Sequence, residues 1–487
     1  MFEDVEPARY VLSVERFGFV TQTYSERSGG GATPISLNSG SEKDIVIKLV
    51  PQAVIAGKVV DEDGDPMPNL QIRVWRYGYN RGRRQLQITQ TTSSMVDGSF
   101  MAGSLPAGKY YVSATDMRAT RDFGGTNERP AKKGPVENYT RTYFPSALDV
   151  SGSAPIELAA GQDIRGVEIR MRKQQVFAIR GKLVSDAGAL NSPIYLILSP
   201  KGIDAFSNLG ANTRPKEGHF EFPSVPPGTY IIQSNPNQRL DPASTVVVNA
   251  RYEVTVADQN IEDLSVPLAV PAEITGSFKM DADPSNTAQQ SQTPPVPAVN
   301  LMVSEGVMFG SPYARANADW TFQIKNVYPA KYRVNVNGIP DGAYVKSITF
   351  GGQDVTHSEL DLTSGSGGAM QIVFSPNAAD ISGTVRSADG NAAARVQITV
   401  WRPGSPDPPR NMLSDTSGAF KMRSLAPGDY KVAAWEDVEA GMVLDPEFLK
   451  LFEPRAQSVS LRESSHESLE LKMISKDDLD AEAAKLK

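Results

Sequence analysis

A single spacing recurs four times along the chain and limits its fold more than any other feature. A phenylalanine is followed ten residues later by a tyrosine, and a proline-containing turn lies just before each tyrosine. The four pairs are Phe100 and Tyr110, Phe220 and Tyr230, Phe322 and Tyr332, and Phe420 and Tyr430. Because other loops vary in length while this interval does not, we expect a rigid strand–turn–strand unit in every copy.

A glycine opens each copy and an alternating strand closes it. The opening glycines follow an isoleucine by two residues and are Gly57, Gly181, Gly276 and Gly383. Segments with the apolar–polar alternation of a half-buried strand close the copies at 44–49, 167–171, 264–268, 370–374 and 469–473. Successive tyrosines, counted from Tyr10, are 100, 120, 102 and 98 residues apart, which indicates tandem domains rather than short solenoid repeats.

The strand density predicts the architecture of each copy. About seven short strands in roughly 100 residues are typical of a two-sheet sandwich. We expect an all-β fold of tandem antiparallel β-sandwich domains in an elongated array. Because linkers such as 173–175 are short, the array is expected to be a stiff rod. The expected boundaries are 1–52 (C-terminal part of an incomplete sandwich), 53–175 (repeat with a long loop), 176–270 (degenerate repeat), 271–377 (degenerate repeat with a proline-rich insert), 378–475 (last repeat) and 476–487 (charged tail).

Helix signals are few. Asp445 and Pro446 have the residue types of an N-cap and a first helical position. A short helix begun there carries its apolar side chains on one side: Phe448, Leu449 and Phe452. The charged tail after Ser475 is interpreted either as a frayed helix or as disordered chain.

Two copies carry a fuller motif. The first has Gly-Lys-Val-Val-Asp, Asp-Gly-Ser-Phe and Leu-Pro-Ala-Gly-Lys-Tyr at 57–61, 97–100 and 105–110, and the last copy has matching residues. These residues resemble carboxypeptidase regulatory-like domains, which are transthyretin-like or prealbumin-like. The resemblance implies transthyretin-like or Ig-like sandwiches close to carbohydrate-binding-like folds, in a multi-repeat bacterial protein of the envelope or exterior. It implies no activity, because the peptidase domain that such modules accompany has no counterpart in this sequence.

The first residues fit the repeat only in part. The turn before Tyr10 and the tyrosine itself are present, but the phenylalanine ten residues earlier would fall before Met1. We therefore expect the chain to begin inside an incomplete domain. The N-terminus lacks a basic stretch followed by an apolar one, so we expect an extracellular or envelope protein whose signal peptide is missing from these residues. No apolar run approaches the length of a transmembrane helix.

Composition argues against most catalytic chemistry. The 49 basic and 56 acidic residues give a net charge of −7, which argues against nucleic-acid binding through a basic surface. Cysteine is absent, and the three histidines, His219, His357 and His466, are not spaced as zinc ligands. We expect a protein that is not an enzyme and uses no cofactor.

A cluster of carboxylates forms a weak candidate for a calcium site. Asp61, Asp63 and Asp65 lie within five residues. Counted from Asp61, however, Gly64 is at the fourth position, whereas a calcium loop has its glycine at the sixth, and Ile72 is at the twelfth, where a calcium loop has glutamate. A hairpin turn is the favoured interpretation of this segment.

Aromatic residues beside arginine are the strongest candidates for ligand binding. Trp75 and Trp401 lie 18 residues after Gly57 and Gly383, and strand alternation predicts that both face away from the sandwich core. The candidate ligand-binding set is Trp75, Arg76, Tyr77, Tyr79, Trp401 and Arg402. Stacking on sugar rings is one interpretation. Packing against a long loop or a neighbouring domain is the other, and is favoured.

The leading functional hypothesis is a non-catalytic modular scaffold for adhesion or interaction, with a glycan or another envelope protein as partner. A carbohydrate-binding protein that uses exposed tryptophan and tyrosine is the first alternative. An accessory region of a larger enzyme or transporter is the second. The sequence leaves the ligand and the oligomeric state open.

Overall fold

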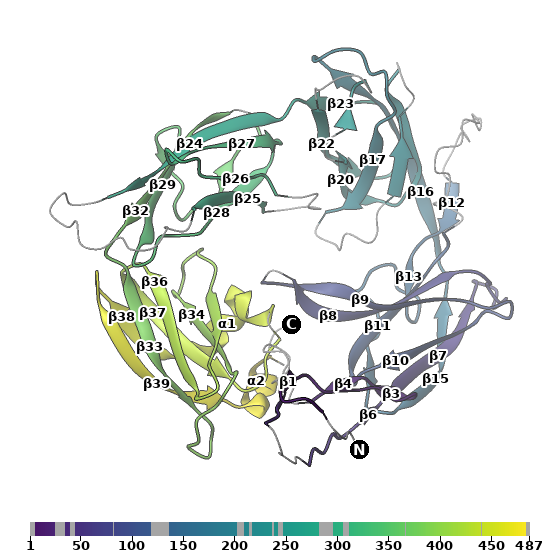
Figure 1. The fold of residues 1–487 in the computed structure, drawn as a ribbon. Helices are drawn as coiled ribbons and strands as arrows, with labels where there is room; N and C mark the ends of the chain where they lie inside the picture. Colours follow the sequence, from purple (N-terminus) through teal and green to yellow (C-terminus); the bar gives the residue numbers. More distant parts are fainter. Residues whose placement is uncertain are drawn as a thin grey trace.

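The computed structural model describes residues 5–24, 35–38, 44–80, 82–117, 136–201, 209–213, 217–235, 238–241, 247–281, 296–304, 311–365, 367–439 and 441–483. Most of the proline-rich insert expected at 281–298 in the third repeat (282–295) and most of the long loop of the first (118–135) lie outside these residues. β-strands are the dominant regular structure of the described residues, with only η2 and two short α-helices beside them, so the all-β prediction is confirmed (Figure 1).

The first complete repeat pairs two sheets. One has the order β10–β7–β15, and the other the order β13–β11–β8–β9, with β14 added to β11. The strands are β7 (Ala53–Val60), β8 (Gln71–Asn80), β9 (Arg83–Ser93), β10 (Ser99–Leu105), β11 (Gly108–Thr115), β13 (Thr142–Tyr143), β14 (Ile156–Leu158) and β15 (Asp163–Arg170). From the long loop, β12 (Val136–Tyr139) leaves this repeat and pairs with β16 of the next.

The second repeat follows the same plan, with its two sheets joined where β22 pairs with β23. Its strands are β16 (Lys173–Ser185), β17 (Tyr195–Pro200), β18 (Leu209–Asn212), β19 (His219–Val225), β20 (Gly228–Ser234), β21 (Gln238–Arg239), β22 (Val247–Val256) and β23 (Ile261–Ala269).

The third and fourth repeats also follow it. The third contains β24 (Ala272–Met280), β25 (Ala298–Val303), β26 (Tyr313–Arg315), β27 (Thr321–Val327), β28 (Lys331–Asn337), β29 (Tyr344–Phe350), β30 (Gln353–Asp354), β31 (Leu360–Asp361) and β32 (Gly368–Ser375). The fourth contains β33 (Ala379–Arg386), β34 (Gln397–Trp401), β35 (Arg410–Leu413), β36 (Ala419–Leu425), β37 (Gly428–Trp435), β38 (Gln457–Leu461) and β39 (His466–Ile474).

The opening glycine is required by a parallel strand pair. In every complete repeat the opening strand pairs in parallel with the closing strand, as β7 does with β15, so the sandwiches are not wholly antiparallel. A Cβ on Gly57 would lie 1.8 Å from the carbonyl oxygen of Val167, and one on Gly383 would lie 1.9 Å from that of Leu469. Only glycine lets the two backbones approach this closely.

The fixed interval of ten residues has a structural cause. The phenylalanine strand of each repeat carries a β-bulge where it pairs with the opening strand. A two-residue turn then leads into the tyrosine strand, as Pro106 and Ala107 do between β10 and β11. The hydroxyl of Tyr110 donates a hydrogen bond to the carbonyl oxygen of Pro106 at 2.7 Å, which locks the turn. Tyrosines 10, 230, 332 and 430 make the same bond to the residue four positions earlier.

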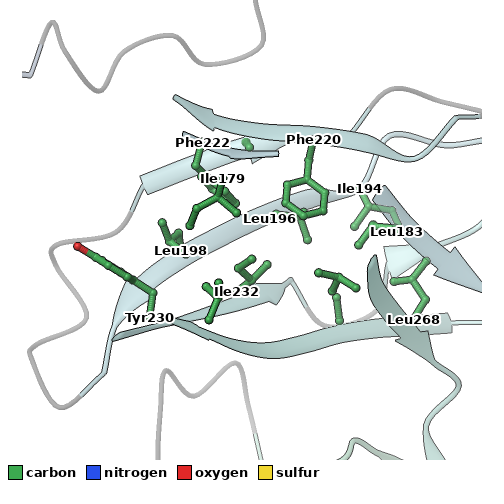
Figure 2. Packing of buried hydrophobic residues seen from close by; sticks show 14 of the residues in the cluster. Ile179, Leu183, Ile194, Leu196, Leu198, Phe220, Phe222, Tyr230, Ile232 and Leu268 are labelled. Atoms are coloured by element: carbon green, nitrogen blue, oxygen red, sulfur yellow. The ribbon is translucent and has the colours of Figure 1, made fainter. Parts of the chain in front are cut away.

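Each of the four complete repeats has a separate hydrophobic core within its own residues. Figure 2 shows the core of the second repeat, where Phe220 and Phe222 from one sheet face Leu196 and Ile232 from the other. Inward side chains from two packed sheets are what a β-sandwich buries. The cores of the first and fourth repeats use equivalent positions of their opening strands, Ile55 and Val59 in β7 and Ile381 and Val385 in β33.

The fourth repeat has a second apolar layer outside its sandwich. The 3₁₀ helix η2 (Met442–Leu444) leads into α1 (Pro446–Phe452), and α2 (Lys476–Ala483) follows β39. The predicted helix is confirmed: the Asp445 side chain accepts a hydrogen bond from the Glu447 backbone at 2.9 Å, and Phe448, Leu449 and Phe452 are buried. Part of the charged tail is helical, and its Leu479 joins the same layer.

The first residues form short paired strands rather than a full sandwich. These are β1 (Arg9–Tyr10) with β5 (Ile35–Ser36), β2 (Ser13–Val14) with β4 (Gln22–Thr23), and β3 (Phe19–Val20) with β6 (Val50–Pro51). Tyr10 pairs with Ile35 as Tyr110 pairs with Ile156.

The expected elongated rod is wrong, although the tandem all-β array is confirmed. Figure 1 shows the four complete sandwiches following one another around a ring, and the β8–β9 hairpin of the first contacts η2 of the fourth. The backbone N–H of Tyr79 donates to Oε1 of Glu439 at 3.2 Å. Short linkers limit the motion between neighbouring domains, but they do not require the domains to lie in one line. Here successive domains are turned relative to one another so that the fourth contacts the first.

Candidate functional site

Trp75 points away from the sandwich core as predicted, but it is buried. Only 1% of its surface is exposed, and its indole N–H donates to the Ser113 hydroxyl at 2.8 Å. Tyr143, from the long loop, lies 6.4 Å from the ring, and the guanidinium groups of Arg73 and Arg141 lie over it. Packing against the long loop, rather than an exposed stacking surface, is therefore the arrangement at Trp75, because Tyr143 of that loop lies over the outer face of β8.

Trp401 is buried by different elements. It is 5% exposed and belongs to the outer apolar layer of the fourth repeat, with Trp435 and Phe448. Trp435 stacks edge-on against Phe452 with ring centroids 5.0 Å apart. Helix α1, which lies between β37 and β38, and helix α2, which follows β39, cover this face of the sheet, so Trp401 is not available to a sugar ring either.

Arg76 and Arg402 occupy equivalent places and brace the tyrosine turn. The guanidinium of Arg402 donates to the carbonyl oxygen of Pro427 at 2.5 Å and lies 4.8 Å from the Tyr430 ring centre. A Cβ on Gly428 would lie 3.1 Å from this guanidinium, and one on Gly108 would lie 3.4 Å from that of Arg76. These arginines therefore support the turn of their own repeat.

Tyr77 and Tyr79 lie on the hairpin that closes the ring. Tyr77 packs edge-on against Tyr111 with ring centroids 5.6 Å apart, and the Arg84 guanidinium lies 4.2 Å from its ring. Tyr79 is half-buried against the fourth repeat, where its N–H bonds to Glu439. The candidate set is therefore divided among three places rather than gathered in one site.

The ring-closing contact brings two backbones very close. A Cβ on Gly441 would lie 2.6 Å from the carbonyl oxygen of Tyr79, and one on Gly82 would lie 2.1 Å from that of Leu444. Two segments more than 350 residues apart thus meet through glycines, a geometry that a larger side chain would block.

Burial also raises the pKa values of two groups at this contact, Tyr79 and Asp445. Burial, with help from the charge of Asp445, raises the pKa of Tyr79, while Arg84 opposes the rise. Burial likewise raises the pKa of Asp445, the N-cap of α1. The closure is a desolvated interface with both polar and apolar parts.

The carboxylates at 61–65 build a turn. Oδ1 of Asp61 accepts hydrogen bonds from the N–H groups of Asp63 and Asp65 at 3.0 and 2.9 Å. The N–H of Asp61 in turn donates to the carbonyl oxygen of Asp65 at 2.9 Å. Glu62 pairs with Lys173 instead. Among the described residues, no group of three or more His, Cys, Asp or Glu side chains is placed to hold a metal ion.

One histidine lies at a domain junction. Nδ1 of His357, in the third repeat, is 2.8 Å from Oδ1 of Asp407, in the fourth. Arg333 donates to the carbonyl oxygen of Pro406 at 3.4 Å across the same junction. Between the first and second repeats, Asn138 donates to the Ser224 hydroxyl at 2.7 Å. Side-chain bonds therefore join successive repeats at these two junctions.

Sequence reasoning singled out Tyr79 but missed the other residues of the ring closure. Glu439, Gly441 and Gly82 have no repeat counterpart and no motif around them. One usable signal was the unusual length of the hairpin, since β8 and β9 extend beyond the corresponding strands β34 and β35.

Comparisons with known proteins add little about function. No family model matches the chain, and no curated protein matches it. Among solved structures, the Bacillus anthracis TIE protein is similar at 12% identity over 89% of this chain and 76% of that one, with a TM-score of 0.17. Two B repeat units of the Staphylococcus aureus collagen-binding protein are similar at 11% identity over 79% and 93%, with a TM-score of 0.16.

The major pilin subunit of Bacillus cereus is also similar, at 11% identity over 67% of this chain and 99% of that one, with a TM-score of 0.16. At such identities and TM-scores, these likenesses carry no argument about activity, ligand or partner. No described helix is both long and apolar enough to span a bilayer.

Proposed function

We propose that this protein is a non-catalytic interaction scaffold of the bacterial envelope or exterior. The closed ring of four sandwiches is the observation that carries the proposal. It holds the outer surfaces of separate domains at fixed positions, because the first and last domains contact each other through Tyr79 and Glu439. Such an arrangement suits binding over a wide surface rather than chemistry in an enclosed cleft.

The burial of the candidate aromatic residues supports a scaffold rather than a sugar-binding protein. Trp75 and Trp401, the two residues on which glycan stacking depended, are packed beneath other elements of the chain. Their arginine neighbours support turns. The residues singled out for ligand binding thus stabilise domains and their contacts.

Surface exposure and partner capture test the proposal together. Intact cells of the source organism are treated with protease and probed with an antibody against the chain, with a cytoplasmic protein as control. The purified chain is then cross-linked to the envelope fraction, and its partners are identified by mass spectrometry. We expect loss of the antibody signal and specific cross-links. A chain that is recovered only in the cytoplasmic fraction of fractionated cells would contradict the proposal.

A further inference from the structure

The edge strand β9 of the first repeat is much longer than its counterparts. It has 11 residues and, among the described strands, pairs only with β8. The strands at the same edge of the other repeats are β18, β26 and β35, with 4, 3 and 4 residues. A very short edge strand is one of the means by which a sheet avoids pairing with another chain. The first repeat lacks this protection.

The sequence of β9 lacks two further protections. Residues 85–96 contain no charged residue and no proline, the residue types that keep exposed edges from pairing. The run is instead rich in threonine and glutamine and includes Leu86 and Ile88. Threonine and isoleucine are β-branched and favour extended strands. This segment is therefore suited to pair with a further strand.

The contact with the fourth repeat shows which way the backbone of the hairpin points. The N–H of Tyr79 donates to Glu439, and the carbonyl oxygen of Tyr79 faces Gly441, so both groups point away from β9. Tyr79 lies opposite Arg84 in the antiparallel ladder of β8 and β9. In such a non-hydrogen-bonded pair both residues turn their backbone groups away from each other, so those of Arg84 point out of the sheet.

The other end of β9 also exposes backbone groups. The N–H of Ser94 donates to the carbonyl oxygen of Leu70 at 3.0 Å, so Ser94 faces β8 and the preceding Ser93 faces outward. A bulge at Thr89 separates the two ends of the strand. The residues whose backbone groups point out of the sheet are Arg84, Leu86, Ile88, Thr91 and Ser93, and these groups bond to no other described residue.

We propose that β9 pairs in antiparallel orientation with β9 of a second copy of this chain. With Arg84 of one copy opposite Ser93 of the other, Leu86 lies opposite Thr91, and all four residues present backbone groups to the facing strand. The two bulges then meet at the centre and leave the outer pairs intact. Two-fold symmetry forms each pair twice, as in an isologous dimer.

The ends of the strand favour a second copy as the occupant. The turn after β9 carries Met95 and Val96, which are 61% and 90% exposed. In the proposed register Ser94 lies opposite Arg83 of the other copy, so this turn extends beside that exposed arginine. The aliphatic stem of Arg83 covers the two apolar side chains, and Asp97 supplies the opposite charge. The uncharged middle of β9 places no like charges opposite each other.

Concentration dependence tests the dimer in the wild-type chain. The purified full chain is followed by sedimentation velocity from low micromolar to high micromolar concentration, and we expect a reversible equilibrium between monomer and dimer. Amide exchange, measured by mass spectrometry at both ends of this range, should be slower within 84–93 at high concentration. Exchange in the second, third and fourth repeats should not change.

Variants of the exposed Thr91 locate the interface. Thr91→Pro removes an N–H that makes no bond within the described chain, so the ladder with β8 is retained. The dissociation constant of the dimer should rise at least about tenfold. Thr91→Val keeps the N–H and is the matched control, which should leave the constant unchanged.

A second pair of variants tests the ends of the interface. Val96→Lys places a positive charge beside Arg83 of the other copy and should weaken the dimer. Val46→Lys is the control, because Val46 is similarly exposed, at 83%, and lies outside the proposed interface. Equal weakening by both variants would contradict the register.

Three results would overturn the proposal. These are a chain that stays monomeric over the whole range, a dimer that slows exchange outside 84–93 and not within it, and a Thr91→Pro dimer as tight as the wild type. The exchange measurement on the wild type needs no variant, so a misfolded Thr91→Pro chain leaves the test intact. Self-association of the purified chain is independent of its location in the cell, so failure of the dimer and failure of the scaffold function are distinguishable.

Discussion

The backbone N–H of Tyr79 and the side chain of Glu439 are 3.2 Å apart and join the first and fourth sandwiches across 360 positions of sequence. Around this bond, Gly441 and Gly82 let the two backbones meet closely. The contact converts a string of domains into a ring (Figure 1).

A side chain at Gly441 should open the ring. Gly441 has an ordinary helical φ of −72°, so Gly441→Val adds no local backbone strain and acts only through the clash with Tyr79. We expect a larger radius of gyration in small-angle X-ray scattering. Gly103→Val is the control, because a Cβ there would lie 3.9 Å from its nearest contact. An unchanged radius of gyration for Gly441→Val would show that the ring does not depend on this contact.

The opening glycine should be indispensable to its repeat. Gly57→Ala places a Cβ 1.8 Å from the Val167 carbonyl oxygen and should destabilise the first repeat by about 1–3 kcal/mol or more. Amide exchange measured by mass spectrometry should rise in residues 53–171 and stay constant in the third repeat, which serves as internal reference. Gly103→Ala, in β10 of the same repeat, should leave exchange unchanged. Equal exchange in both variants would contradict the close approach.

Alkaline pH should destabilise the second and third repeats. Burial raises the pKa of Tyr230 and of Tyr332 to about 12, from an ordinary value of 10.0. Between pH 10 and 12 the unfolded chain loses these protons while the folded one keeps them, so the free energy of unfolding falls as pH rises.

The free energy of unfolding, measured by urea unfolding at each pH, should fall much less between pH 10 and 12 in the double variant Tyr230→Phe and Tyr332→Phe. At neutral pH each substitution should cost about 0.5–1.5 kcal/mol, because one turn hydrogen bond is lost. Exposed Tyr313→Phe is the control. Tyrosinate absorbance that rises fully by pH 11 in the folded wild type would argue against burial of both hydroxyls.

Trp401 should matter for stability rather than for sugar binding. Trp401→Ala removes a buried ring from the layer beneath α1 and should cost about 3–5 kcal/mol. Amide exchange in α1 and α2 should rise, while Phe17→Ala, whose ring is fully exposed, should change nothing. Binding to a glycan array by the wild type that is lost in Trp401→Ala without any change in α1 exchange would restore the carbohydrate interpretation.

Patterns local to one repeat were predictable. The interval from Phe100 to Tyr110 indicated a rigid strand–turn–strand unit. The structure adds the bulge in β10, the two-residue turn and the Tyr110 hydrogen bond that holds it. The N-cap at Asp445 was also predictable, because capping depends on residues within one helical turn.

The candidate site was only half predictable. Alternation correctly placed Trp75 outside its sandwich core, since the period of two is a property of the strand itself. It left open whether a long loop or a neighbouring domain covers that face, and the structure shows Tyr143 of the long loop there. What covers an outward side chain is set by elements distant in sequence.

The amino-acid sequence by itself determined the repeats and their turns, because those features follow from backbone geometry over a few residues. The reason that Gly57 must be glycine came from the tertiary structure, since the Val167 carbonyl that a Cβ would meet belongs to a distant strand. The tertiary structure alone decided that the chain closes on itself and which elements cover its outward tryptophans. Both depend on packing between segments that are not neighbours in the sequence, such as Tyr79 with Glu439 and Trp75 with Tyr143, and such packing leaves no periodic trace in the sequence.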